Sequence, residues 1–194
     1  MTAPRWFTFF ALLTVATDIA TVALWVLAAL SLTGRTARDR WQYVREVLGD
    51  VALPIAAIVA VVAMAGSLYL SEGAHLVPCK LCWYQRSAMY PLALLLVIAA
   101  VRRDWAIRPY ALALAAVGAL ISTYHYSIER LPSLEIGHGG CDPSNPCTIT
   151  LIWKFHYISI PFMALSAFVF VVTILVSGLP PEPLVEVGAR DDEE

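Results

Sequence analysis

Two pairs of cysteines are the residues of this sequence best suited to carry out chemistry. Cys79 and Cys82 are separated by two residues in VPCKLCWYQR, and Cys141 and Cys147 are separated by five in GGCDPSNPCT. Closely spaced cysteines can exchange disulfides, brace a loop or bind a metal ion. Which of these applies depends on the compartment and on the residues around each pair.

The first pair shares one helical stripe with an arginine. Cys79, Cys82 and Arg86 stand at positions i, i+3 and i+7, and Pro78 suits the first position of a helix. Backbone N–H groups at a helix start and a nearby cation both stabilise a thiolate. A disulfide between residues three apart constrains little chain. We therefore favour redox chemistry over a structural bridge for this pair.

The second pair lies in a loop with Asp-Pro and Ser-Asn turn patterns. Taken alone, Cys141 and Cys147 are compatible with an ordinary extracellular structural disulfide. The presence of Cys79 and Cys82 on the same side of a membrane makes a purely structural role less expected. Two disulfides on one side can form a relay by thiol–disulfide exchange.

A zinc site is the metal alternative, with His75, His138 and His156 as further ligands. CxxC is a common half-site for zinc. The other half-site would be CDPSNPC, whose five intervening residues exceed the usual spacing of about two to four. The spacing therefore argues against a metal site.

The elements that position these cysteines are predicted to be membrane helices. Of the 194 residues, 59% are hydrophobic and 14% are charged, which is too apolar for an ordinary soluble domain. Runs long enough to span a bilayer cover residues 7–32, 51–71, 84–101, 108–126 and 157–178. Lipid favours helices for such runs. The fold class is therefore an all-α membrane protein, and the net charge of −2 gives no reason to expect nucleic-acid binding.

Arginines in the short loops predict the orientation. They follow the first run and separate the third from the fourth, and they are Arg35, Arg38, Arg40, Arg45, Arg102, Arg103 and Arg108. Because cytoplasmic loops are rich in Lys and Arg, the amino terminus and all four cysteines are placed outside and the carboxyl terminus inside. The first run is too long for a signal peptide, and Asp18 interrupts it. Polar residues within a span, such as Asp18 and Thr21, mark a functional site or, more often, face a neighbouring helix and are hydrogen-bonded there, and we expect the second.

Two further segments flank these runs. Residues 35–49 place Trp41, Val44 and Leu48 on one face, as in an interfacial cytoplasmic helix. Residues 179–194 are proline-rich and acidic, so we expect a disordered tail.

A pair that oxidises other thiols needs an electron acceptor. The sequence has no CxxCH haem motif, iron–sulfur run or dinucleotide-binding motif, which leaves an acceptor dissolved in the lipid, such as a quinone. Arg86 is placed to donate a hydrogen bond to a quinone carbonyl. His125 is expected near the outer end of the fourth run, at a depth similar to that of Arg86.

The blocks PCKLCWYQR, MYPLALLL and TLIWKFHYISIPFMALSAF, with the loop cysteines between the last two, resemble the DsbB family of disulfide bond formation proteins. The resemblance is to its BdbC-like branch, which has a short loop between the second two cysteines, and it covers approximately residues 50–178. The vitamin K epoxide reductase family also combines a helical bundle, CxxC and a quinone, but its loop cysteines precede the CxxC motif.

The resemblance implies a four-helix transmembrane bundle in the bacterial cell membrane. Such a protein reoxidises an extracytoplasmic thioredoxin-like thiol oxidase (DsbA-like) and reduces a membrane quinone, ubiquinone or menaquinone, and so supports disulfide bond formation in exported proteins. Residues 1–49 add one N-terminal transmembrane helix and the interfacial segment to this redox domain, which covers 50–178. The alternative function is a non-enzymatic membrane protein whose two disulfides brace outer loops.

The resemblance also assigns roles to single residues. Cys79 and Cys82 match the quinone-coupled pair, with Cys82 nearest the quinone. Cys141 matches the cysteine that forms a mixed disulfide with the partner, and Cys147 the one that then exchanges with Cys79. Arg86 matches the arginine of the quinone site.

His125 is the second residue expected at the quinone. It lies where some members of the family have a histidine close to the quinone.

Overall fold

The computed structural model describes residues 5–134, 141, 145–150 and 153–178. Its long helices are α1 (Arg5–Leu30), α2 (Arg35–Leu68), α3 (Lys80–Arg102), α4 (Arg108–Arg130) and α5 (Ile160–Ser177), with short turns η1 (Tyr69–Gly73), η2 (Trp105–Ile107) and η3 (Pro132–Leu134). All five long helices have the length and hydropathy of membrane spans. The predicted all-α, multi-pass membrane protein is therefore confirmed.

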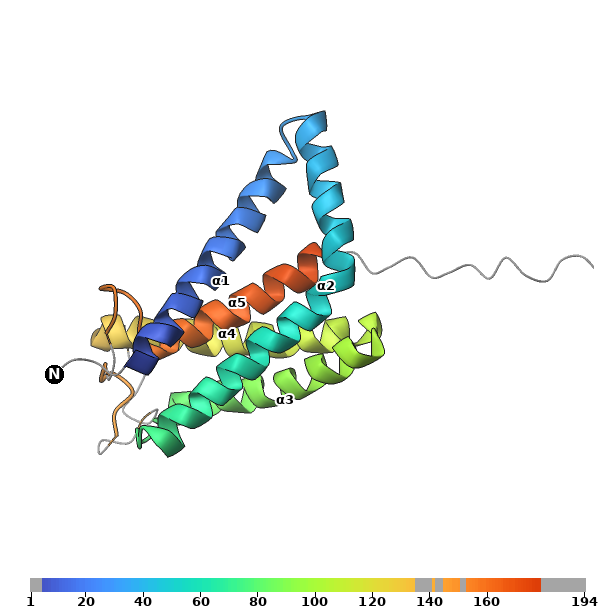
Figure 1. Cartoon of the computed structure of the whole chain (residues 1–194). Helices are drawn as coiled ribbons and strands as arrows, with labels where there is room; N and C mark the ends of the chain where they lie inside the picture. The colour runs from blue at the N-terminus through green and yellow to red at the C-terminus, as the bar shows by residue number, and fades with distance from the viewer. Residues whose placement is uncertain (1–4, 135–140, 142–144, 151–152, 179–194) are drawn as a thin grey trace, which may run out of the picture.

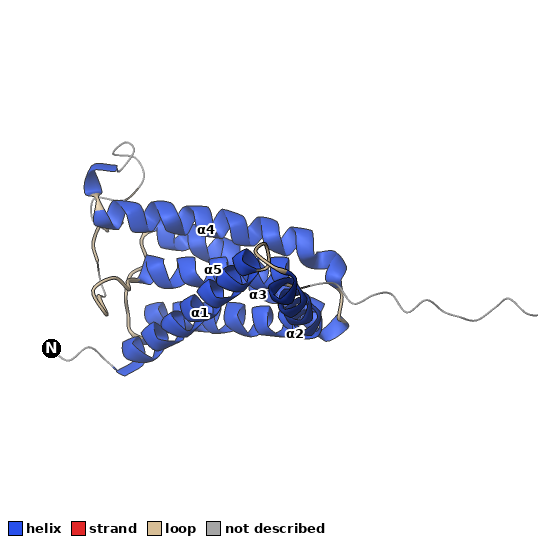
Figure 2. Ribbon diagram, turned by 90° about the horizontal axis from the view of Figure 1, so that it is seen from above, coloured by secondary structure: helices blue, strands red, loops and turns tan. Residues whose placement is uncertain are grey.

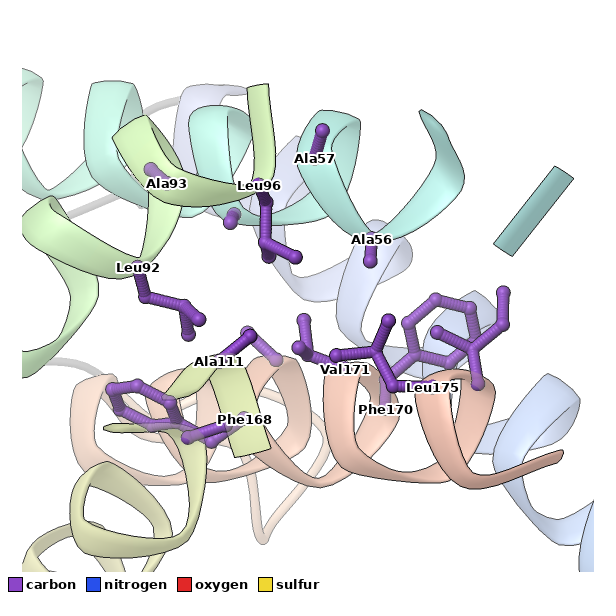
Figure 3. Packing of buried hydrophobic residues seen from close by; sticks show 14 of the residues in the cluster. Ala56, Ala57, Leu92, Ala93, Leu96, Ala111, Phe168, Phe170, Val171 and Leu175 are labelled. Carbon is purple, nitrogen blue, oxygen red and sulfur yellow. The ribbon is translucent and has the colours of Figure 1, made fainter. Parts of the chain in front are cut away.

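Helices α2 to α5 form the four-helix bundle. α3 packs against α2 and α4, and α5 packs against α4 and α2. Figure 1 shows this elongated bundle from the side. Fully buried alanines on α2 (Ala52, Ala56 and Ala60) recur every four residues, so they form one stripe of small side chains. Larger residues of α3 and α5, including Leu92, Leu96, Phe168 and Val171, fill the space facing them (Figure 3).

Helix α4 packs tightly against α5 at Gly118. A Cβ atom added there would lie 2.2 Å from Cζ of Phe168, whose side chain is fully buried. We predict that Gly118→Ala lowers the free energy of unfolding by about 1–3 kcal/mol, because the packed ring must move. The shift in the midpoint of unfolding by sodium dodecyl sulfate measures this loss. Gly34→Ala, at a position with no atom within 4 Å of the added Cβ, is the control and should shift the midpoint little.

Helix α1 lies outside the bundle and packs across α5 and α2 (Figures 1 and 2). Two polar contacts attach it to α5. Asp18 hydrogen-bonds to Ser166, and the indole Nε1 of Trp25 donates to Oγ1 of Thr173 at 3.1 Å. Asp18 thus faces a neighbouring helix as expected, whereas the buried Thr21 hydroxyl donates to a carbonyl of its own helix.

The predicted interfacial segment at 35–49 and the predicted span that begins at 51 belong to one helix in the structure. α2 is continuous from Arg35 to Leu68 and contains Pro54 in its interior. An internal proline bends a helix without ending it where the neighbouring residues remain helical. Figure 1 shows the first half of α2 leaving the bundle together with the end of α1. The helical conformation of 35–49 is confirmed, and its location at the membrane surface stays a prediction.

The bundle has a cysteine end and an arginine end. Cys79 directly precedes α3 and Arg102 closes it, and a helix of that length spans about 35 Å. At the second end Arg45 donates to the carbonyl of Ser177, and Arg108 to that of Val176. The predicted tail at 179–194 lies outside the described residues.

Candidate redox site

Cys79 caps the amino terminus of α3. Its backbone is extended, with φ −71° and ψ 171°, and its Sγ accepts the N–H of Cys82 at 3.4 Å. The prediction that Pro78 occupies the first helical position is therefore wrong. An N-cap residue must be non-helical for its side chain to turn back onto the first N–H groups, so the helix begins at Lys80 and Pro78 precedes the cap.

The two sulfur atoms of the CxxC motif face each other as thiols. Cys79 Sγ lies 3.1 Å from Cys82 Sγ, with Cys79 buried and Cys82 half-buried. A disulfide requires a sulfur separation of about 2.05 Å. An approach of about 1 Å therefore closes the bond, and the pair can be oxidised without rearranging α3.

His125 on α4 joins this pair to the second one. Its Nε2 is 3.6 Å from Cys79 Sγ and 3.2 Å from the carbonyl oxygen of Cys147. A carbonyl only accepts, so Nε2 carries the proton and can also donate to a Cys79 thiolate. The buried Nδ1 has no hydrogen-bond partner among the described residues. His125 is thus a donor shared between the two cysteine pairs.

The pKa of Cys79 is lowered to about 4. The main cause is the hydrogen bond from the Cys82 thiol, and the bond and positive charge of His125 add to it, while burial acts in the opposite direction. At neutral pH the reduced pair therefore holds a thiolate at Cys79. A low pKa makes a thiolate a good leaving group in disulfide exchange.

This pKa predicts an unusual pH dependence for alkylation. In the reduced Cys141→Ala/Cys147→Ala protein, the rate of Cys79 modification by iodoacetamide should change less than about twofold between pH 8 and pH 6, since protonation begins only near pH 4. A thiol with an ordinary pKa of 9.0 slows about 100-fold over that range. Peptide mass spectrometry gives the rate at Cys79. A tenfold fall per pH unit would contradict the lowered pKa.

The second pair forms a disulfide, Cys141–Cys147. Cys147 is 1% exposed and packs with Cys79 and Ile128, while Cys82 and the half-buried Cys141 lie against the same cluster. The loop is attached there by Asn145, whose Nδ2 donates to the carbonyl of Pro78 at 3.2 Å. All four predicted cysteines therefore come together at one end of the bundle, with Cys141 the more accessible sulfur of its pair.

Arg86 is fixed by two hydrogen bonds to one residue of α2. Its Nε donates to Ser67 Oγ and an Nη2 hydrogen to the Ser67 carbonyl, both at 2.8 Å. Its guanidinium also lies over the ring of Trp83, 5.2 Å from the centroid. Ser67 was not among the predicted residues. The sequence offered one indication of such a residue, because an arginine within an apolar segment needs a hydrogen-bond partner.

The residues predicted to bind the quinone line one cavity of about 310 Å³. Its lining includes Cys79, Cys82, Arg86 and His125. Most of the other lining residues are apolar, among them Ile58, Val59, Val62, Met89, Met163 and Phe168. Small-molecule sites typically combine such an apolar wall with a few polar groups, in cavities from about 300 Å³ upward.

Cys79, Cys82 and His125 also form a group of possible metal ligands, with ligand atoms within 4.8 Å of one another. The predicted zinc alternative involved the loop cysteines, which are joined to each other instead. Zinc–sulfur bonds of about 2.3 Å in a tetrahedron place two thiolates about 3.8 Å apart. The observed 3.1 Å lies between this spacing and the disulfide bond length of about 2.05 Å.

Comparison with known proteins agrees with this constellation. The model of the family described as disulfide bond formation protein DsbB matches residues 50–178. A probable disulfide formation protein of Oceanobacillus iheyensis is 43% identical over 119 residues, which is 60% of this chain and 82% of the relative. Disulfide bond formation protein C of Bacillus subtilis is 43% identical over 118 residues, 61% of this chain and 85% of the relative.

No solved structure matches the chain. The family match covers α2 from its middle to the end of α5, and so includes both cysteine pairs, Arg86 and His125. The chain thus belongs to the DsbB family of disulfide bond formation proteins, in its BdbC-like branch.

Proposed function

We propose that this protein is a membrane thiol:quinone oxidoreductase. It reoxidises a thioredoxin-like thiol oxidase outside the cytoplasm and passes the electrons to a membrane quinone, ubiquinone or menaquinone. The observation that carries the proposal is the packing of both cysteine pairs into one cluster around His125. That arrangement supports electron transfer by exchange between the pairs, since each exchange needs two sulfurs within bonding reach.

The first exchange takes place at the loop. A thiolate of the reduced partner attacks Sγ of Cys141 and releases Cys147 as a thiolate, and the second partner thiol then displaces Cys141. The partner leaves oxidised, having given up two electrons, and the loop pair is reduced. The greater exposure of Cys141 than of Cys147 supports this order of attack.

The second exchange moves the two electrons to the CxxC pair. Cys147 attacks Cys79 in the Cys79–Cys82 disulfide and releases Cys82, and Cys141 then attacks Cys147 and releases Cys79. The loop disulfide is restored and the CxxC pair is reduced. The lowered pKa of Cys79 favours its departure in the second half of this step. His125 Nε2 donates a hydrogen bond to Cys79 Sγ, the sulfur that leaves in this second half.

The cavity residues fit a quinone as the electron acceptor. When bound, a quinone takes up two electrons and two protons and so returns the CxxC pair to its disulfide. Of the five guanidinium N–H donors of Arg86, two are used by Ser67 among the described residues. The remaining donors suit a carbonyl oxygen that gains negative charge. His125 is a further polar residue in the cavity lining.

The two ends of the bundle support the proposed orientation. Arginines 45, 102 and 108 lie at the end opposite the cysteines, and cytoplasmic ends of membrane helices are enriched in arginine. The cysteine end then faces the extracytoplasmic side, where disulfides persist.

The competing function, two disulfides that only brace outer loops, does not account for a capped Cys79 thiol in contact with a histidine. Quinone reduction separates the two functions. Purified protein given a reduced thioredoxin-like protein and a soluble quinone should show thiol-dependent loss of quinone absorbance. Replacing Cys141 or Cys147 by alanine should abolish turnover with the protein substrate. No turnover by the unsubstituted protein, or turnover that survives these replacements, would contradict the proposal.

A further inference from the structure

Helix α1 is not part of the family match, which begins at residue 50, yet it reaches the redox cavity. Four of its residues, Phe10, Leu13, Thr14 and Thr17, line the same space as Cys82 and Arg86. They stand at positions i, i+3, i+4 and i+7, which form one stripe of a helix. The cavity thus has one wall that the four-helix bundle does not supply.

This wall contacts α2 directly beside the residue that holds Arg86. The ring of Phe10 packs on Gly66 so closely that a Cβ there would lie 2.9 Å from Cε1 of Phe10. The next residue, Ser67, accepts both hydrogen bonds from Arg86. The position of α1 and the position of the guanidinium are therefore defined by neighbouring residues of α2.

The wall offers shape and apolar surface rather than hydrogen bonds. The hydroxyl of Thr14 donates to the carbonyl of Phe10 and that of Thr17 donates to the carbonyl of Thr14. The donors of both threonines are thus used within α1, and a ligand carbonyl must find its donors on other parts of the lining, such as Arg86 of α3. Apart from these hydroxyls, the stripe presents methyl groups, a leucine and an aromatic ring.

The opposite face of α1 points away from the protein. Leu12 is 55% exposed and Ile19 is 65% exposed, and neither lines the cavity. In a membrane this face contacts acyl chains. Without α1, lipid would stand where Phe10, Leu13 and Thr14 now stand. α1 therefore replaces a fluid wall of the cavity by one of fixed shape.

We propose that α1 is a specificity-determining wall of the quinone site, with Leu13 and Thr14 limiting which quinone fits beside Arg86 and Cys82. This inference rests on the proposed function. It assigns to the additional helix a role in quinone binding, which is separate from the exchange with the protein partner proposed at the loop disulfide.

Two adjacent leucines provide a matched test. Leu13→Phe adds volume to the wall, and Leu12→Phe adds the same volume on the lipid face. For the full-length protein in detergent, we expect Leu13→Phe to raise the Kd for decylubiquinone, measured by equilibrium dialysis, about fivefold or more. Leu12→Phe should leave this Kd within about twofold of the original. The KM for the quinone should follow the Kd.

A second readout checks that the variants are folded. The preoxidised proteins, without quinone, should oxidise a reduced thioredoxin-like protein in a single turnover at the unchanged rate. Leu13→Ala, which removes volume, should also change the Kd while Leu12→Ala does not. Equal Kd values for the Leu12 and Leu13 variants would overturn the role of α1 and leave the proposed function standing. Failure of the unsubstituted protein to bind or reduce quinone would overturn both.

Discussion

Cys79→Ala and Cys82→Ala should each reduce the rate of quinone reduction by on the order of 10³-fold or more. With either thiol missing, the pair cannot re-form its disulfide and so cannot deliver two electrons. The two sulfurs, 3.1 Å apart, act as one unit, and the double variant should therefore lose no more than either single one. Steady-state loss of quinone absorbance measures the effect.

The choice of reductant shows where the block lies. Cys79→Ala and Cys82→Ala should be inactive with a protein dithiol and with dithiothreitol alike. Cys141→Ala/Cys147→Ala should be inactive with the protein dithiol but keep measurable turnover with dithiothreitol, since Cys82 is only half-buried. Substantial turnover by either CxxC variant with any dithiol would place the quinone-coupled chemistry elsewhere.

Arg86→Lys should lower kcat for quinone reduction by about 10²-fold or more, although it keeps the positive charge. Arg86 bonds twice to Ser67 and still has N–H groups directed elsewhere, whereas an ammonium group has three donors and no planar fork. A lysine that takes over the contact to Ser67 no longer reaches a quinone carbonyl in the same geometry. Initial rates at saturating quinone give kcat, and rates across quinone concentrations give KM.

Two controls accompany this variant. Ser67→Ala removes one of the two acceptors of Arg86 and keeps the backbone carbonyl, so its effect should be smaller than that of Arg86→Lys. Arg130→Lys alters an arginine at the same end, stacked on Trp153 at 3.9 Å and outside the cavity lining. It should leave quinone kinetics nearly unchanged. Equal losses for Arg86→Lys and Arg130→Lys would indicate a general effect of charge rather than a role for Arg86 at the quinone.

The helices could be predicted from the sequence because the length of an apolar run directly reflects the thickness of a bilayer. Four of the five predicted runs contain most of one observed helix, and the run at 51–71 contains the second half of α2. The start of α3 and the continuity of α2 could not be predicted in this way. Both depend on local geometry, namely the turn of the Cys79 side chain onto the N–H of Cys82 and the tolerance of α2 for Pro54.

The residues of the site also divide into those that the sequence predicted and those that only the structure shows. The motif spacing indicated that Cys79, Cys82 and Arg86 act together. The predicted orientation of the helices added the loop cysteines and His125, and the resemblance assigned their roles. The contact of Ser67 with Arg86 and the approach of Phe10 to Gly66 involve residues with no distinctive pattern. Such contacts arise from the packing of α1 and α3 against α2, which the sequence alone does not specify.

Direct exchange between Cys79 and Cys147 is the central step of the account, and trapping it is the most direct test. The double variant Cys82→Ala/Cys141→Ala leaves these two thiols, which share His125 Nε2 as a neighbour. Mild oxidation should join them in an intramolecular disulfide, identified as a linked peptide pair by mass spectrometry. The matched variant Cys79→Ala/Cys147→Ala should form no such link between Cys82 and Cys141. If Cys79 and Cys147 instead remain free thiols under these conditions, the relay between the two pairs is contradicted.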